Sequence, residues 1–168
     1  MLLKDYIPNL SKINRKIFFS GISFDSSKVK KNFIFFAIKG SKYDGNSFVK
    51  EAIKNGAKII VSEKKFPKKE DNVVYLKVPN VRKLLSCIAY KIIKKKPKKL
   101  IAVTGTNGKS SVADFYYQIL TTNKTKVAAI GTVGIKFKNQ KRISKTTTLD
   151  PIELSLTLKK LKKDKIDF

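Results

Sequence analysis

Apolar residues recur along this chain in two alternating patterns, one typical of strands and one typical of helices. Short runs rich in β-branched and aromatic residues predict strands at 17–24, 33–38, 57–61 and 73–78. Helical spacing predicts a helix at 47–55, closed by Gly56, and a longer helix that Asn80 caps. The longer helix has a continuous apolar stripe typical of packing surface, formed by Val81, Leu84, Leu85, Ile88, Ala89, Ile92 and Ile93.

The same alternation resumes after a lysine-rich stretch at 94–99, which Pro97 interrupts. The elements predicted there are a buried strand at 100–103, a helix from Lys109, a strand at 126–130, a helix capped by Asp150, and the first residues of a further strand at 165–168. In this second stretch, alternating strands and helices predict a parallel sheet. We therefore expect an α/β fold: a small mixed α/β domain at 1–96, then the beginning of a doubly wound parallel-sheet domain at 97–168, which stops in mid-domain.

The stretch Thr104-Gly-Thr-Asn-Gly-Lys-Ser110 has the residue types of a phosphate-binding loop (P-loop). Gly105 and Gly108 permit positive φ and a close approach of the backbone to a ligand. The helix that follows presents unpaired amides and its positive dipole end, both of which favour a polyphosphate. Lys109, the predicted catalytic residue, is expected to reach the β and γ phosphates of ATP, and the Ser110 hydroxyl to ligate Mg²⁺. The predicted ATP-binding residues are Gly105, Thr106, Asn107, Gly108, Lys109, Ser110 and Ser111.

Only Thr106 and Asn107 separate the two glycines, whereas the standard phosphate loop has four residues there. An ordinary glycine turn is the alternative interpretation, but the order of strand, glycines, lysine, hydroxyls and helix favours a phosphate site. The shorter loop resembles that of the Mur ligase family, whose members join an amine to a carboxylate with ATP. The resemblance implies an ATP-dependent ligase that uses Mg²⁺.

This resemblance extends over nearly the whole chain. The similar segments are 24–40, 43–48 and 52–57 in the first predicted domain, and Asn107, 130–134 and 147–151 in the second. The first group is similar to the uridine-nucleotide domain of MurE-type and MurF-type members, and the second to the MurE type. The implied substrates are UDP-N-acetylmuramoyl-L-alanyl-D-glutamate and a diamino acid. The implied contacts to the UDP-muramoyl substrate are Phe24, Ser26, Ser41, Lys42, Tyr43, Thr146, Thr147 and Thr148.

Each of these substrate contacts also has a structural interpretation, because serine, glycine and aspartate are common turn residues and the threonines suit a strand. Three positions depart from the family pattern. Ser27 stands where an arginine is usual, Asn32 where a glycine is usual, and Leu149 where a proline is usual. Asn32 can still adopt the left-handed conformation of a glycine turn, so we expect the backbone path there to be kept.

The reaction that the resemblance implies is amide formation. The substrate carboxylate attacks the γ phosphate, giving an acyl phosphate and ADP, and the incoming amine then displaces phosphate. The family's acidic magnesium ligand, carbamylated lysine and amino-acid-selecting C-terminal domain have no counterpart in these 168 residues. We therefore expect this chain alone not to complete the reaction.

Two alternative functions stay open from the sequence. One is a MurF-type ligase, and the other is a nucleotide-binding module without catalysis.

The formal net charge of +26 adds a further alternative, because a basic domain can bind nucleic acid or an anionic membrane surface through phosphates alone. The lysines are scattered, however, and only three of the 38 basic residues are arginine, the better bidentate reader of bases and phosphates. Nucleic acid is therefore not expected to be the principal ligand.

A single cysteine, Cys87, excludes an internal disulfide framework, and its place in an apolar helix predicts a buried thiol. No apolar run reaches the roughly 18 residues of a membrane helix, and the N-terminus lacks a secretory layout. We expect a cytoplasmic protein that is not inserted in a membrane, with an oligomeric state that the sequence does not indicate.

Overall fold

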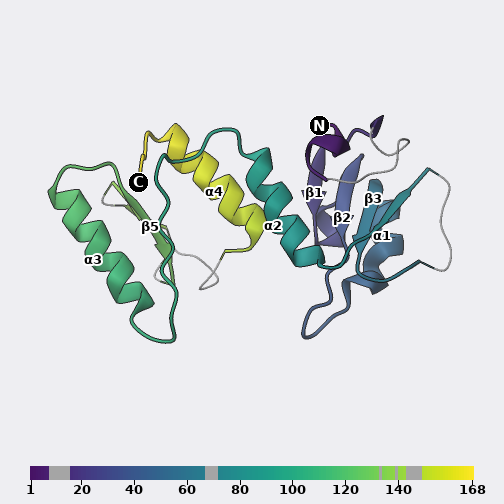
Figure 1. Ribbon diagram of the computed structural model, residues 1–168, viewed down its shortest axis with the longest axis horizontal. Helices are drawn as coiled ribbons and strands as arrows, with labels where there is room; N and C mark the ends of the chain where they lie inside the picture. Colours follow the sequence, from purple (N-terminus) through teal and green to yellow (C-terminus); the bar gives the residue numbers. More distant parts are fainter. Residues whose placement is uncertain (8–15, 67–71, 133, 139, 143–148) are drawn as a thin grey trace. The chain divides into compact units, whose positions relative to one another are not determined.

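The computed structural model describes residues 1–7, 16–66, 72–132, 134–138, 140–142 and 149–168. The chain divides into two compact units, Met1–Lys91 and Ile92–Phe168, each of which is described by itself below. The α/β class is confirmed, since both units combine helices with strands and one sheet is parallel throughout (Figure 1).

The first unit is built on a four-stranded parallel sheet in the order β1-β2-β3-β4. The strands are β1 (Gly21–Ser23), β2 (Phe33–Phe36), β3 (Ala57–Ser62) and β4 (Val74–Lys77). The helices are α1 (Val49–Lys54) and α2 (Val81–Ile92), with short 3₁₀ turns η1 (Leu3–Asp5), η3 (Ser26–Lys28) and η4 (Gly45–Phe48). Figure 1 shows the sheet between α1 and α2. Because all four strands are parallel, their carboxyl ends lie at the same edge of the sheet.

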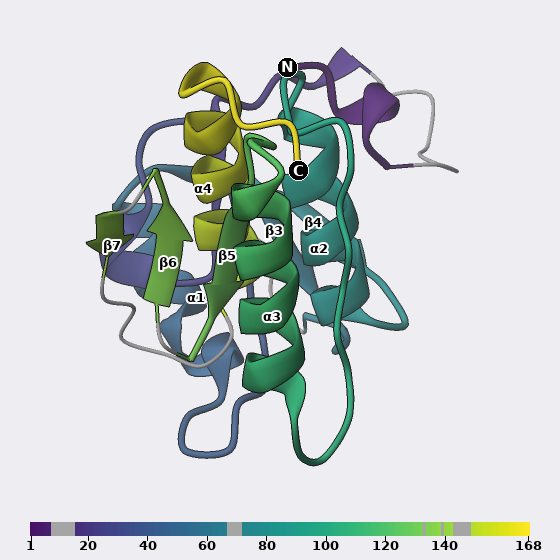
Figure 2. The same cartoon turned by 90° about the vertical axis from the view of Figure 1, so that its left-hand side faces the viewer.

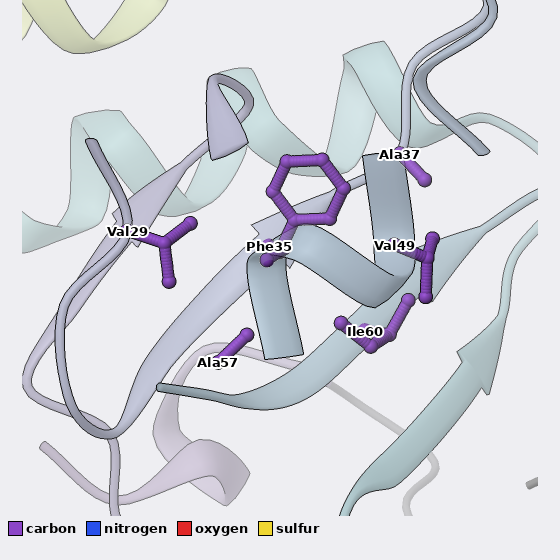
Figure 3. Close-up of a cluster of buried hydrophobic side chains, with 7 residues drawn as sticks. Val29, Phe35, Ala37, Val49, Ala57 and Ile60 are labelled. Atoms are coloured by element: carbon purple, nitrogen blue, oxygen red, sulfur yellow. The ribbon is translucent and has the colours of Figure 1, made fainter. Parts of the chain in front are cut away.

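The core of this unit covers both faces of β2 and β3, which explains why these strands are continuous apolar runs rather than alternating ones. Phe35 and Ile60 are register partners, and both are fully buried on the face that α1 covers. Figure 3 shows this cluster, which Val29, Ala37, Val49, Ala52 and Ala57 complete. Burial of each large side chain of this kind contributes about 1.5–3 kcal/mol.

The second unit contains helices on both sides of a three-stranded antiparallel meander. Its elements are α3 (Lys109–Thr122), β5 (Ala128–Gly131), β6 (Gly134–Phe137), β7 (Gln140–Arg142) and α4 (Pro151–Lys163). Figures 1 and 2 both show β5 between α3 and α4. Ile135 packs with Leu149, Leu161 and Ile166 in a core on the α4 side.

The pairing within this meander is antiparallel, and it involves two strands outside the predicted parallel set at 100–103, 126–130 and 165–168. Gly131 ends β5 and Gly134 begins β6, and so short a connection permits only antiparallel pairing. The apolar pattern of the chain does not predict β6 or β7.

The buried strand predicted at 100–103 is not formed. Leu100 and Ile101 are 50% and 54% exposed. A buried parallel strand needs hydrogen-bonding neighbours and a cover on both faces. The described residues supply a backbone partner only at its start, where the Lys99 amide donates to the Asp167 carbonyl over 3.0 Å.

The end of the chain shows the beginning of strand pairing that the pattern at 165–168 predicts. The Asp167 amide donates to the Lys126 carbonyl over 3.0 Å, and the Ala128 amide donates to the Phe168 carbonyl over 2.9 Å. These residues therefore lie beside the start of β5.

Several local predictions are confirmed at the level of single contacts. Asn80 Oδ1 accepts from the Lys83 amide at the start of α2, and Asp150 Oδ1 accepts from the amides of Ile152 and Glu153 at the start of α4. Asn32 has a left-handed φ of 64°. The prediction of a buried Cys87 is wrong, because its position on α2 faces solvent. Within the described ranges, no helix is both long and apolar enough to span a membrane.

Candidate functional site

The predicted phosphate loop folds as a glycine-bounded turn at the start of α3. Gly105 has a φ of 147° and Gly108, the N-cap residue of α3, has a φ of 76°. Both angles lie where residues with a Cβ are strained. A Cβ on Gly108 would meet no atom within 4 Å, so this position requires glycine for its conformation rather than for space.

The first turn of α3 has the features of an anion site. Its N-cap residue has no side chain to accept a hydrogen bond from the helix amides, whereas Asp150 caps α4 with its carboxylate. The amides of Lys109, Ser110 and Ser111 therefore point out of the helix start without a helical acceptor. Together with the helix dipole they favour a negatively charged group.

The Lys109 side chain folds back over the loop that precedes it. Its Nζ donates to the Gly105 carbonyl over 2.6 Å and to the Thr106 carbonyl over 2.8 Å. An ammonium group has three donors, so one is left to meet an anion at the helix start. The arrangement places the positive charge of Lys109 beside the loop at the start of α3.

The Ser110 hydroxyl is exposed in the same turn and lies 3.5 Å from the Thr132 hydroxyl, which follows β5. Hydroxyl oxygens are hard donors that suit Mg²⁺, an ion that keeps several waters and is commonly shared with substrate phosphates. Among the described residues, no three His, Cys, Asp or Glu side chains gather into a metal site. The exposed Ser110 hydroxyl is therefore a side chain whose chemistry suits such an ion.

A small cavity lies between the first two turns of α3 and the β5–β6 hairpin. Its lining includes Ser110, Asp114, Ala129, Thr132 and Lys136. Lys136 forms an ion pair with Asp114 across it. The Lys136 ammonium, and then the Gln118 amide, hold the pKa of the Asp114 carboxyl below its usual range.

The contacts to the UDP-muramoyl substrate that are predicted in the first unit follow the carboxyl ends of β1 and β2. Ligands of open parallel sheets commonly bind at this edge. Phe24 is exposed directly after β1, and the exposed loop Ser41–Tyr43 follows β2. This loop is held by two backbone hydrogen bonds, from the Gly40 amide to the Tyr43 carbonyl and from the Gly45 amide to the Ile38 carbonyl, both 2.9 Å long. Phe24, which the resemblance places at the uridine end, has an exposed aromatic ring that suits stacking on a base.

Ser26 differs from the other predicted substrate contacts of the first unit because it is buried. Its hydroxyl donates to the Glu51 carboxylate over 2.9 Å, and its carbonyl accepts from the Asn55 side chain over 3.0 Å. These contacts tie η3 to α1. They make Ser26 a residue that supports the loop after β1, and a direct contact to a ligand stays a prediction.

A second polar network stabilises the loop after β2. Asp44 accepts from the Asn46 amide and from Lys64 Nζ, the latter over 2.7 Å, and the Ser62 hydroxyl donates to the Asn46 side chain over 2.6 Å. The Lys64 ammonium, followed by the Asn46 hydrogen bonds, holds the pKa of the Asp44 carboxyl well below its usual range. The network anchors the loop that carries Tyr43.

The structure thus brings the seven predicted loop residues together, while the predicted threonines Thr146, Thr147 and Thr148 lie outside the described residues. Thr132, Asp114 and Lys136 are neighbours of the loop that the sequence pattern did not predict. A partial signal was present, because Ser110 and Asp114 are four residues apart and so share a helix face.

Two protein-family models match the chain. One, described as the Mur ligase family, catalytic domain, matches residues 18–91, and the other, the Mur ligase middle domain, matches residues 103–168.

Two curated relatives are named UDP-N-acetylmuramoyl-L-alanyl-D-glutamate–2,6-diaminopimelate ligase. One from Rickettsia prowazekii (strain Madrid E) is 37% identical over 164 residues, which cover 95% of this chain and 34% of the relative. Another from Clostridium tetani (strain Massachusetts / E88) is 38% identical over 170 residues, which cover 99% of this chain and 34% of the relative.

A solved structure with this name has a TM-score of 0.82 and 26% identity, and the match covers 100% of this chain and 34% of that one. The chain therefore spans about a third of the length of the relatives it matches.

Proposed function

Because this chain belongs to the Mur ligase family, we propose that it forms the ATP and nucleotide-sugar sites of a ligase that extends UDP-N-acetylmuramoyl-L-alanyl-D-glutamate by one amino acid. The observation that carries this proposal is the loop at Gly105–Ser111. It combines two left-handed glycines, free helix amides and the Lys109 ammonium at a single helix start. Such a combination suits the polyphosphate of a nucleotide.

The two units have separate tasks in this proposal. In the first unit, Phe24 and the loop Ser41–Tyr43 hold the uridine end and the sugar of the substrate. In the second unit, Gly105 to Ser111 hold ATP, and the threonines Thr146, Thr147 and Thr148 hold the muramoyl peptide near the γ phosphate. The support for the first task is the position of both segments at the carboxyl edge of a parallel sheet.

The chemistry is phosphoryl transfer followed by acyl transfer. A carboxylate oxygen of the muramoyl peptide attacks the γ phosphorus, the bond to the β,γ-bridging oxygen breaks, and ADP leaves. The amino group of the incoming residue then attacks the acyl carbon and displaces phosphate. Lys109 and the helix amides supply positive charge to the transferring group, which is the main contribution a protein makes to such reactions. A magnesium ion bound at Ser110 would neutralise further phosphate charge.

The relatives' names favour 2,6-diaminopimelate over lysine as the added amino acid, and we propose diaminopimelate for this protein too. They also favour the MurE type over the MurF type. Since the substrates are intracellular nucleotide conjugates, a cytoplasmic location follows from the same proposal.

The test is calorimetric titration of this chain with magnesium-ATP at physiological salt. We expect saturable binding that Lys109→Ala weakens at least about tenfold, the usual effect of losing a charged hydrogen-bond donor. Lys159→Ala, which removes the same charge from the exposed side of α4, should leave the affinity unchanged.

A parallel titration with UDP-N-acetylmuramoyl-L-alanyl-D-glutamate tests the first unit. Phe24→Ala should weaken this binding, and Phe18→Ala, at another exposed phenylalanine of the same unit, should not. The proposal fails if the chain binds neither ligand and instead binds arbitrary DNA with an affinity that Lys109→Ala does not change.

A further inference from the structure

The helix that carries the candidate nucleotide loop is only lightly covered by apolar contacts. No side chain of α3 is fully buried. Its partly covered residues include Ala113, Tyr117 and Leu120, which share one face at helical spacing. With so little apolar burial, the position of α3 on the sheet depends on a few specific contacts.

Two polar contacts join the same face of α3 to the β5–β6 hairpin. Lys136 of β6 forms its ion pair with Asp114, and the Thr132 and Ser110 hydroxyls lie 3.5 Å apart. Ser110 and Asp114 are one helical turn apart, so the two contacts follow one another along α3. The side chains of Lys136 and Asp114 are 29% and 34% exposed, so solvent screens this pair less than a fully exposed one.

The alternation of side chains along β6 places Lys136 on the side of the hairpin that faces α3. Its neighbours Ile135 and Phe137 point to the α4 side, where they pack with Leu161. Successive side chains of a strand alternate between faces, so Lys136 points to the α3 side. Its register partner is Ala129, whose small side chain leaves room for the lysine to reach Asp114.

We propose that Lys136 is a positioning residue for the candidate nucleotide site. Through Asp114 it holds the first two turns of α3 on the hairpin, and it thereby keeps the Ser110 hydroxyl beside Thr132, where a magnesium ion on the nucleotide would meet it. The inference rests on the proposed ATP site and adds a residue that lies 27 positions after Lys109 and outside the loop.

The test compares nucleotide binding with and without magnesium in Lys136→Met. We expect the affinity for magnesium-ATP to fall about threefold to fivefold, the range of a partly exposed ion pair. The affinity for metal-free ATP should fall less, because the Ser110 hydroxyl contributes only when the metal is present. Lys136→Arg should keep wild-type affinity, since it retains the ion pair.

One further variant serves as a control and a second tests whether the ion pair can be restored. Lys162→Met removes a similar ion pair, with Asp167 at 2.8 Å, from the end of α4, and should change neither affinity. The charge-exchanged double variant, Asp114→Lys with Lys136→Asp, keeps the net charge and should recover part of the magnesium-dependent affinity. Amide hydrogen exchange without nucleotide should show α3 less protected in Lys136→Met than in Lys162→Met.

The outcomes separate the two proposals. If Lys109→Ala abolishes binding but Lys136→Met matches the wild type, the ATP site stands and the positioning role is wrong. The positioning role is also wrong if Lys136→Met loses the same affinity for ATP with and without magnesium. It is wrong too if the charge-exchanged variant is folded but recovers no magnesium-dependent affinity. If the wild type binds no ATP, the proposed function fails. Unchanged α3 protection in Lys136→Met would then show that the ion pair does not hold the helix either.

Discussion

Single residues set the shape of the candidate nucleotide loop. Gly108 begins α3 in the left-handed region, and its surroundings would accommodate a Cβ. Gly131, at the end of β5, also has open space but no positive φ. The two glycines therefore separate the effect of backbone conformation from that of added volume.

Gly108→Ala should lower the free energy of unfolding of the second unit by about 1 kcal/mol, because alanine is strained in the left-handed region. It should also weaken magnesium-ATP binding by disturbing the loop. Denaturant unfolding and calorimetry would measure the two effects. Gly131→Ala is the matched control for stability and should change the free energy of unfolding little; equal losses of stability at the two glycines would argue against a conformational requirement at Gly108.

The charge of the Asp44 carboxylate makes the free energy of unfolding of the first unit depend on pH. This carboxylate is stabilised by Lys64, so its pKa in the folded chain lies below the ordinary 3.8. The stabilisation is complete above the unfolded-state pKa and is lost progressively as the pH falls towards the folded-state value. Asp44→Asn should therefore be less stable than the wild type near neutral pH, and the difference should narrow below about pH 4.

Urea unfolding of both proteins at about pH 7 and about pH 3 would measure this difference. Asp5→Asn, at an exposed carboxylate of the same unit, serves as the comparison. A gap between wild type and Asp44→Asn that did not change with pH would show that Asp44 acts through its shape and not its charge.

At the scale of elements, α3 is the helix whose pattern and packing disagree. The apolar positions that identify it as a helix include Val112, Phe115, Tyr116 and Ile119. In the structure Phe115 and Ile119 are 62% and 60% exposed. An exposed apolar stripe of this kind promotes association.

Replacing both Phe115 and Ile119 with glutamine should reduce the binding of a hydrophobic dye and any concentration-dependent association. The free energy of unfolding should change by no more than about 0.5 kcal/mol, as is usual for exposed sites. Ile135→Ala, in the core under α4, should cost about 2–5 kcal/mol by contrast. A loss from the double variant as large as that from Ile135→Ala would show that the α3 stripe is packed in solution.

At the scale of the whole molecule, the charge of +26 acts independently of the loop. We expect this chain to bind duplex DNA weakly and without sequence preference at low salt. Fluorescence anisotropy should show this binding decreasing steeply between about 50 mM and about 200 mM salt, because it depends on counterion release. Lys109→Ala removes one charge of many and should hardly alter it. DNA binding that resisted salt and depended on Lys109 would contradict this distinction between ATP and polyanion binding.

The sequence by itself determined those features that depend on a few neighbouring residues. The left-handed turn at Asn32, the caps at Asn80 and Asp150, and the loop from Gly105 to Ser111 are of this kind. Backbone preferences and short-range hydrogen bonds are set by local chemistry, so they can be predicted from the order of residues. The strands of the first unit were also predictable, because they are short apolar runs rich in β-branched and aromatic residues, but their parallel order was not.

Only the tertiary structure decided which residues meet across the chain. The contact of Ser26 with Glu51 joins residues 25 positions apart, and that of Lys136 with Asp114 joins residues 22 apart. The antiparallel meander and the exposure of 100–103 depend likewise on which strands become neighbours. Register, strand order and the covered face of a helix arise from packing between distant segments, and a local pattern of apolar residues is compatible with more than one such arrangement.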